Sequence, residues 1–142
     1  MPLSVSTRRW IVVAAIVVYW TILFVFTHLP GDPRPESPHQ KIPHLDKLVH
    51  AAAFAGLAVL ALVAAESFRR VSLPLVFTVA GLLTIYAAFD ELTQGLIRFR
   101  VPDYRDWVAD VLGITVGSLL FWTGRRLWTS DRGETVTARA TK

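Results

Sequence analysis

Cysteine is absent from the sequence, and charged residues are scarce. Without cysteine, the protein has neither a disulfide framework nor a thiolate metal site. Charged residues make up 18% of the chain and hydrophobic residues 53%, which is too apolar a balance for an ordinary soluble domain. The basic residues fall in short segments between apolar runs instead of forming one cluster. They therefore indicate membrane topology, and we expect no nucleic-acid partner.

The first long apolar run covers residues 10–27 and predicts a transmembrane helix. At about 1.5 Å per residue it nearly spans a hydrocarbon core of roughly 30 Å, and Thr21 is its main polar interruption. Two arginines precede it, as in a signal peptide, but no small-residue cleavage site follows before Pro30. We therefore expect a retained anchor.

Three further spans are predicted, at residues 46–65, 71–92 and 106–123, followed by a flexible cytoplasmic tail over 124–142. Five prolines between residues 30 and 43 exclude a helix there, so that segment is expected to be an aqueous loop. The second and third spans are expected to be antiparallel neighbours because few residues separate them. The predicted fold is all-α, a polytopic membrane protein with a four-transmembrane-helix bundle.

The orientation follows from lysine and arginine in the short loops, because translocation of positive charge is disfavoured. Nine of these residues fall on the side of both termini and six on the opposite side. We therefore expect both termini in the cytoplasm and a multi-pass protein in the cytoplasmic membrane. Most polar residues within the spans then lie near the outer face.

Asp46, Lys47 and His50 open the second span. Their spacing of three and four residues places them on one helix surface. Asp46 has an alternative interpretation as an N-cap carboxylate that satisfies free backbone amides at the helix start.

Asp90, Glu91 and Gln94 close the third span, with Tyr86 one turn earlier on the same face. Two adjacent carboxylates at a helix C-terminus oppose the helix dipole, so capping does not explain them. We expect cationic partners, and the available ones are Lys47, Arg98 and Arg100; a carboxylate at membrane depth either pairs with one of these or takes up a proton.

Asp106 and Asp110 lie one turn apart at the start of the fourth span. Asp106 has an alternative interpretation as a helix cap, whereas Asp110 lies inside the span and should face a protein partner or water. Gly113 and Gly117 continue the same stripe, which favours close helix contact. Three spans thus each bring a carboxylate to one membrane level, and this predicts a single shared site.

Read in order, the chain contains Asp46-Lys47-x-x-His50, Asp90-Glu91-x-x-Gln94, Arg100 with Asp106 six residues later, and Asp110-x-x-Gly113. This pattern resembles the VanZ-like family of bacterial membrane proteins over residues 44–120. The resemblance implies one VanZ-like membrane domain over residues 1–142. It also implies a polar set made of Asp46, Lys47, His50, Glu91, Gln94, Arg100, Asp106 and Asp110.

Two positions depart from the family pattern. Phe54 stands where tyrosine is common, which removes a hydroxyl, and Asp110 stands where asparagine is frequent, which adds an ionisable group. The resemblance implies a role in the cell envelope, with resistance to teicoplanin-type glycopeptides as one member function.

Three functions remain open from the sequence. In the first, the protein is not an enzyme, and an outer polar pocket binds a lipid headgroup, a cell-wall precursor or a lipoglycopeptide through its basic residues. In the second, His50 with Glu91 or Asp106 performs acid–base chemistry or holds a divalent metal. In the third, the ion pairs only lock the helices together. We favour the first, with membrane lipids as partners and with neither cofactor nor metal.

Overall fold

The computed structural model describes residues 4–31 and 44–140, with side chains up to residue 127. It contains four helices: α1 (Val5–Thr27), α2 (Leu45–Phe68), α3 (Leu73–Gln94) and α4 (Tyr104–Ala140). All four are long and apolar enough to cross a membrane, α4 through its segment Tyr104–Leu127. The described ranges contain no strand. The predicted all-α fold with four spanning helices is confirmed.

The helix starts follow local sequence signals. Ser4 is the N-cap of α1, where its side chain accepts a hydrogen bond from the backbone N–H of Thr7 at 3.1 Å. Pro74 lies in the first turn of α3, where its missing N–H costs nothing. The N-cap of α2 is His44 in a left-handed conformation, and Asp46 lies in the first turn, so the interpretation of Asp46 as the N-cap is wrong.

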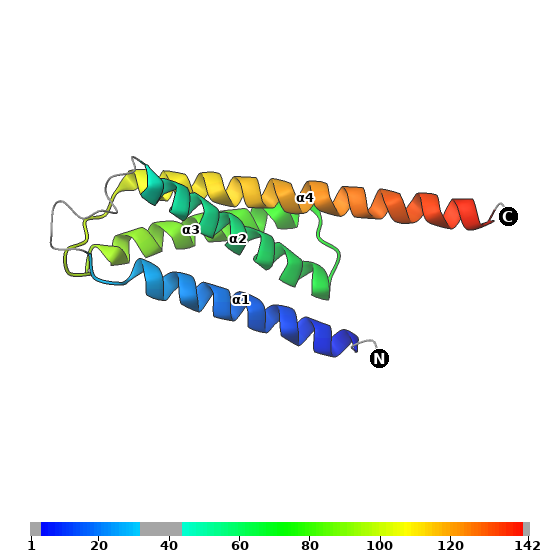
Figure 1. Ribbon diagram of the computed structural model, residues 1–142, viewed down its shortest axis with the longest axis horizontal. Coiled ribbons are helices and arrows are strands. Elements are labelled where there is room, and N and C mark those ends of the chain that lie inside the picture. The colour runs from blue at the N-terminus through cyan, green and yellow to red at the C-terminus, as the bar shows by residue number, and fades with distance from the viewer. Residues whose placement is uncertain (1–3, 32–43, 141–142) are drawn as a thin grey trace.

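The tightest helix pair is α2 with α4, which lie side by side along the bundle (Figure 1). Glycine makes this approach possible. A Cβ at Gly113 would lie 2.1 Å from the carbonyl oxygen of Ala51, and one at Gly117 would lie 2.3 Å from that of Ala55. The predicted glycine stripe is therefore a close-packing surface, as in other small-residue contacts between membrane helices.

The remaining helices pack around this pair. On one side, α1 contacts α2, where the Tyr19 hydroxyl donates to the carbonyl oxygen of Ala53 at 2.8 Å. On the other side, α3 packs against α4. Phe54 is fully buried in the central cluster with Leu57 and Ile114, so the departure from tyrosine places an apolar ring in the core.

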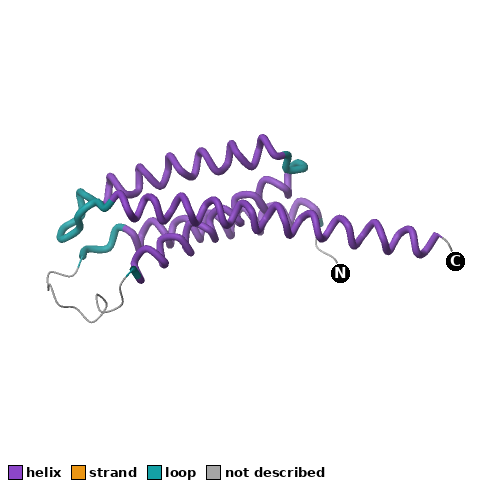
Figure 2. Tube along the Cα trace, turned by 90° about the horizontal axis from the view of Figure 1, so that it is seen from above, coloured by secondary structure: helices purple, strands orange, loops and turns teal. Residues whose placement is uncertain are grey.

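The bundle has two different ends (Figures 1 and 2). The N-terminus, the turn between α2 and α3, and the continuation of α4 lie at one end, while the α3–α4 connection and the start of α2 lie at the other. We call these the terminal end and the polar end. Side chains between them are largely apolar and exposed, which suits contact with lipid.

The helix bounds agree with the predicted spans to within a few residues at the polar end. At its other end α4 continues to Ala140, where the sequence predicted a flexible tail from residue 124. No proline interrupts the helix in this part of the sequence. Most of the predicted proline-rich loop, residues 32–43, lies outside the described residues.

Candidate functional site

Lys47 is the centre of an ion cluster at the polar end. Its Nζ lies 2.8 Å from Asp106, 3.0 Å from Asp46 and 3.2 Å from Asp103. Asp103 directly precedes α4 and accepts a hydrogen bond from the backbone N–H of Arg105, so it caps that helix. This hydrogen bond is the main reason why the pKa of Asp103 is lower than usual, and the contact with Lys47 lowers it further. The carboxylate therefore stays charged. The cluster therefore joins the starts of α2 and α4.

One turn further into the bundle, His50 of α2 pairs with Asp110 of α4. The His50 Nδ1 atom lies 3.0 Å from the Asp110 carboxylate, which is only 1% exposed. The sequence had offered Glu91 or Asp106 as the partner of His50, and the structure gives Asp110 instead. Asp110 reaches His50 because it lies one turn before Gly113, where the two helices approach most closely.

Asp90 of α3 is fully buried and is held by neutral donors. It accepts hydrogen bonds from the Tyr86 hydroxyl at 3.2 Å, the Thr27 hydroxyl at 3.2 Å and the Gln94 amide at 3.0 Å. The ring nitrogen Nδ1 of His28 lies 3.8 Å away. The expectation of a lysine or arginine partner for Asp90 is wrong, because hydrogen-bond donors from α1 and α3 surround the carboxylate.

Glu91 also lacks the expected ion pair. One carboxylate oxygen accepts a hydrogen bond from the backbone N–H of Asp103, which ties α3 to the start of α4. The other oxygen, Oε2, is buried and has no hydrogen-bond partner among the described residues. The expected pairing of Glu91 with Lys47 or Arg100 is therefore wrong.

Arg100 lies in the α3–α4 connection and is fixed by two hydrogen bonds. Its Nη1 donates to the Gln94 side chain at 2.8 Å, and its Nε donates to the carbonyl oxygen of Leu29 at 3.0 Å. The connection is also anchored to the end of α1, because the Gly31 N–H donates to the carbonyl oxygen of Arg98 at 3.1 Å. These contacts hold the guanidinium group beside the polar ends of α1 and α3.

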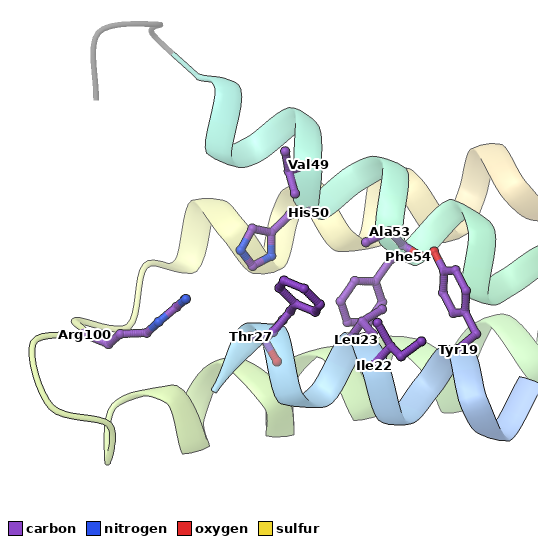
Figure 3. Close-up of a pocket in the computed structure, with 10 residues that line it drawn as sticks. Tyr19, Ile22, Leu23, Thr27, Val49, His50, Ala53, Phe54 and Arg100 are labelled. Carbon is purple, nitrogen blue, oxygen red and sulfur yellow. Dashed lines mark hydrogen bonds between the residues drawn. The ribbon is translucent and has the colours of Figure 1, made fainter. Parts of the chain in front are cut away.

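A pocket of about 370 Å³ opens beside these residues, between α1 and α2 (Figure 3). Its walls are apolar side chains, including Ile22, Phe26 and Val49. His50, Thr27 and Arg100 supply polar groups in the part of the pocket nearest the polar end. Figure 3 shows the side chain of Arg100 extending toward the His50 ring. We call this the α1/α2 pocket.

The structure thus brings the predicted residues to one end of the bundle but divides them into separate groups. Lys47, Asp46 and Asp106 form the ion cluster, and Gln94 links Arg100 to Asp90. Only two of the predicted residues, His50 and Arg100, line the α1/α2 pocket.

Sequence reasoning did not include Asp103, Thr27 or His28. Asp103 carried a usable signal, since an aspartate directly before a span is a typical helix cap. Thr27 and His28 lie in the first span, which the family motifs do not cover. Their side chains contact Asp90 and Thr93 of α3, and only the fold reveals these contacts.

The family model described as VanZ/LLP1 matches residues 10–127 of the chain. No curated protein and no solved structure gave a match. The matched range covers the first span from residue 10 onward and the other three spans in full.

Proposed function

We propose, from the premise that the chain belongs to the VanZ/LLP1 family, that this multi-pass membrane protein binds an anionic amphiphile of the cell envelope. The observation that carries the proposal is the α1/α2 pocket, which combines apolar walls with Arg100 and His50 at one end. Its volume of about 370 Å³ lies within the usual range for small-molecule sites. Such a shape suits a hydrocarbon chain with a charged group attached.

The charge at the pocket favours an anion. Arg100 uses Nη1 and Nε for structural contacts, so its position is set before a ligand arrives. His50 uses Nδ1 for Asp110, and among the described residues no hydrogen bond engages its Nε2. The guanidinium group, together with His50 when both of its ring nitrogens carry a proton, can donate hydrogen bonds to a carboxylate or phosphate oxygen.

The source of the ligand depends on the orientation. Six arginines with described side chains lie near the terminal end: Arg8, Arg9, Arg69, Arg70, Arg125 and Arg126. This charge favours a cytoplasmic location for that end and an outward-facing pocket. A lipid bound through its headgroup, a lipid-linked cell-wall precursor and a lipoglycopeptide all combine an apolar chain with polar groups. We propose a role in teicoplanin-type glycopeptide resistance as one form of this function.

A second candidate is acid–base chemistry on the bound amphiphile. The His50–Asp110 pair favours it, because a buried carboxylate on Nδ1 orients the ring and sets its tautomer for proton transfer at Nε2. Among the described residues, no group of three histidine, aspartate or glutamate side chains is arranged to hold a metal ion. Conversion of the bound amphiphile by purified protein would separate this candidate from simple binding.

Replacing Arg100 by glutamine is expected to lower the amount of amphiphile that co-purifies with the protein by about tenfold, because one charge-assisted contact is lost. Arg98→Gln is the matched control, since Arg98 is exposed, stacks on Phe99 at 4.8 Å and does not line the pocket. Mass spectrometry of extracts from equal amounts of folded protein measures the effect. Equal profiles for the two variants would refute the pocket as the binding site.

A further inference from the structure

A second pocket, of about 270 Å³, lies at the terminal end of the bundle. It is lined by Arg70 from the α2–α3 turn and by Trp122, Arg125 and Arg126 from α4. We call this the arginine pocket. It shares no lining residue with the α1/α2 pocket, and the function proposed above does not use it.

Contacts between the turn and α4 form one side of the arginine pocket. The Arg125 Nε lies 3.1 Å from Glu66, and its Nη1 donates to the carbonyl oxygen of Val71. Glu66 in turn accepts from the Val71 backbone N–H at 2.6 Å. Glu66 and Arg125 therefore hold the turn against α4, and the pocket does not depend on a ligand for its shape.

Trp122 holds two of the guanidinium groups close together. The Arg126 guanidinium lies 5.2 Å from the centre of the indole ring, and that of Arg125 lies 5.7 Å from it. These cation–π contacts offset part of the repulsion between neighbouring arginines. Trp122 also packs against the apolar cluster of Leu62 and Val71, as expected for a tryptophan at a membrane–water interface.

The charge of the arginine pocket calls for an anion. Three of its four lining residues are arginines, which stay positively charged at every physiological pH. Arginine matches the geometry of phosphate oxygens, and basic pockets between membrane helices are known sites for phospholipid headgroups. The apolar surface of the neighbouring spans lies next to the pocket, so a bound headgroup can keep its acyl chains in the bilayer.

We propose that the arginine pocket binds the phosphate group of an anionic phospholipid in the leaflet on the side of the termini. That this leaflet is the cytoplasmic one rests on the orientation proposed above. The binding of the phospholipid does not depend on that orientation. The ligand is a lipid component of the membrane, whereas the envelope amphiphile would enter at the opposite end.

Titration of detergent-purified protein with phosphatidylglycerol, followed by native mass spectrometry, tests this site. Wild type should bind phosphatidylglycerol at least about tenfold more tightly than phosphatidylcholine, and Arg70→Gln should remove most of that preference. Arg69→Gln is the matched control, because Arg69 is exposed in the same turn and does not line the pocket. It removes the same charge and should change the affinity by less than about twofold.

Three results would overturn the proposal. The first is equal loss of affinity in Arg69→Gln and Arg70→Gln, which would indicate general charge attraction. The second is a loss in Arg100→Gln without a loss in Arg70→Gln, which would place the lipid in the α1/α2 pocket instead of the arginine pocket. The third is displacement of the lipid by an equal concentration of glycerol phosphate, which would make the site one for a soluble phosphate. Failure of the envelope-ligand function leaves all three comparisons unchanged.

Discussion

Gly113→Ala is expected to lower the free energy of unfolding by about 3 kcal/mol, since overpacking of a close contact against rigid backbone is costly. The added Cβ would lie 2.1 Å from the Ala51 carbonyl oxygen and 2.8 Å from its carbonyl carbon. Because both are backbone atoms of α2, no side-chain rotation relieves the clash. The two helices must separate, and the His50–Asp110 pair one turn away should lengthen with them.

Gly81→Ala is the matched control for this change. Gly81 lies within α3, and a Cβ there meets no atom within 4 Å. Alanine at an open helix position is favoured over glycine, so this variant should be neutral or stabilised by up to about 1 kcal/mol. Unfolding with increasing SDS in mixed micelles measures both variants. Equal stability of the two would show that α2 and α4 do not approach as closely as described.

The second large effect is expected for Asp90→Ala, with a loss of about 3 kcal/mol or more, because each buried hydrogen-bond donor that loses its acceptor costs about 1 to 3 kcal/mol. The change leaves the donors of Tyr86, Thr27 and Gln94 without their acceptor. It also frees Gln94, which holds Arg100 through its other side-chain atom. We therefore expect this variant to lose bound amphiphile as well as stability.

Asp90→Asn preserves the shape of the side chain and one acceptor oxygen. It should therefore keep more than half of the stability that Asp90→Ala loses. The same SDS titration compares the two variants. If Asp90→Ala unfolded at the same SDS concentration as the wild type, the hydrogen bonds of Asp90 would contribute little to stability. The positioning of Arg100 would then need another explanation.

The fold was predictable because lipid imposes strong rules on sequence. A span must be long and apolar, and a loop must carry the charges, so the four helices follow from the apolar runs alone. The glycine stripe at Gly113 and Gly117 was also readable, since close membrane-helix contacts favour small residues. Family membership over residues 10–127 agrees with the resemblance that the motifs indicated.

The partners within the polar end were less predictable. The charges in the sequence favoured Lys47, Arg98 or Arg100 as the partner of Glu91, but a backbone N–H contacts one oxygen of Glu91 and a side-chain amide engages Arg100. The sequence does not indicate which neutral donor will contact a carboxylate, because every residue except proline has a backbone N–H. The contribution of α1 was missed for a related reason: Thr27 and the carbonyl group of Leu29 become partners only after α1 packs against α3 and the α3–α4 connection.

The ligand class proposed for the α1/α2 pocket depends on which side of the membrane the polar end faces, and thiol labelling of intact cells tests this directly. Val101 is 87% exposed in the α3–α4 connection, whereas exposed Ser72 lies in the opposite turn. The native chain has no cysteine, so single substitutions give no background. We predict that a membrane-impermeant maleimide labels Val101→Cys in intact cells and labels Ser72→Cys only after lysis. Labelling of Ser72→Cys alone in intact cells would place the polar end inside the cell and contradict an envelope ligand.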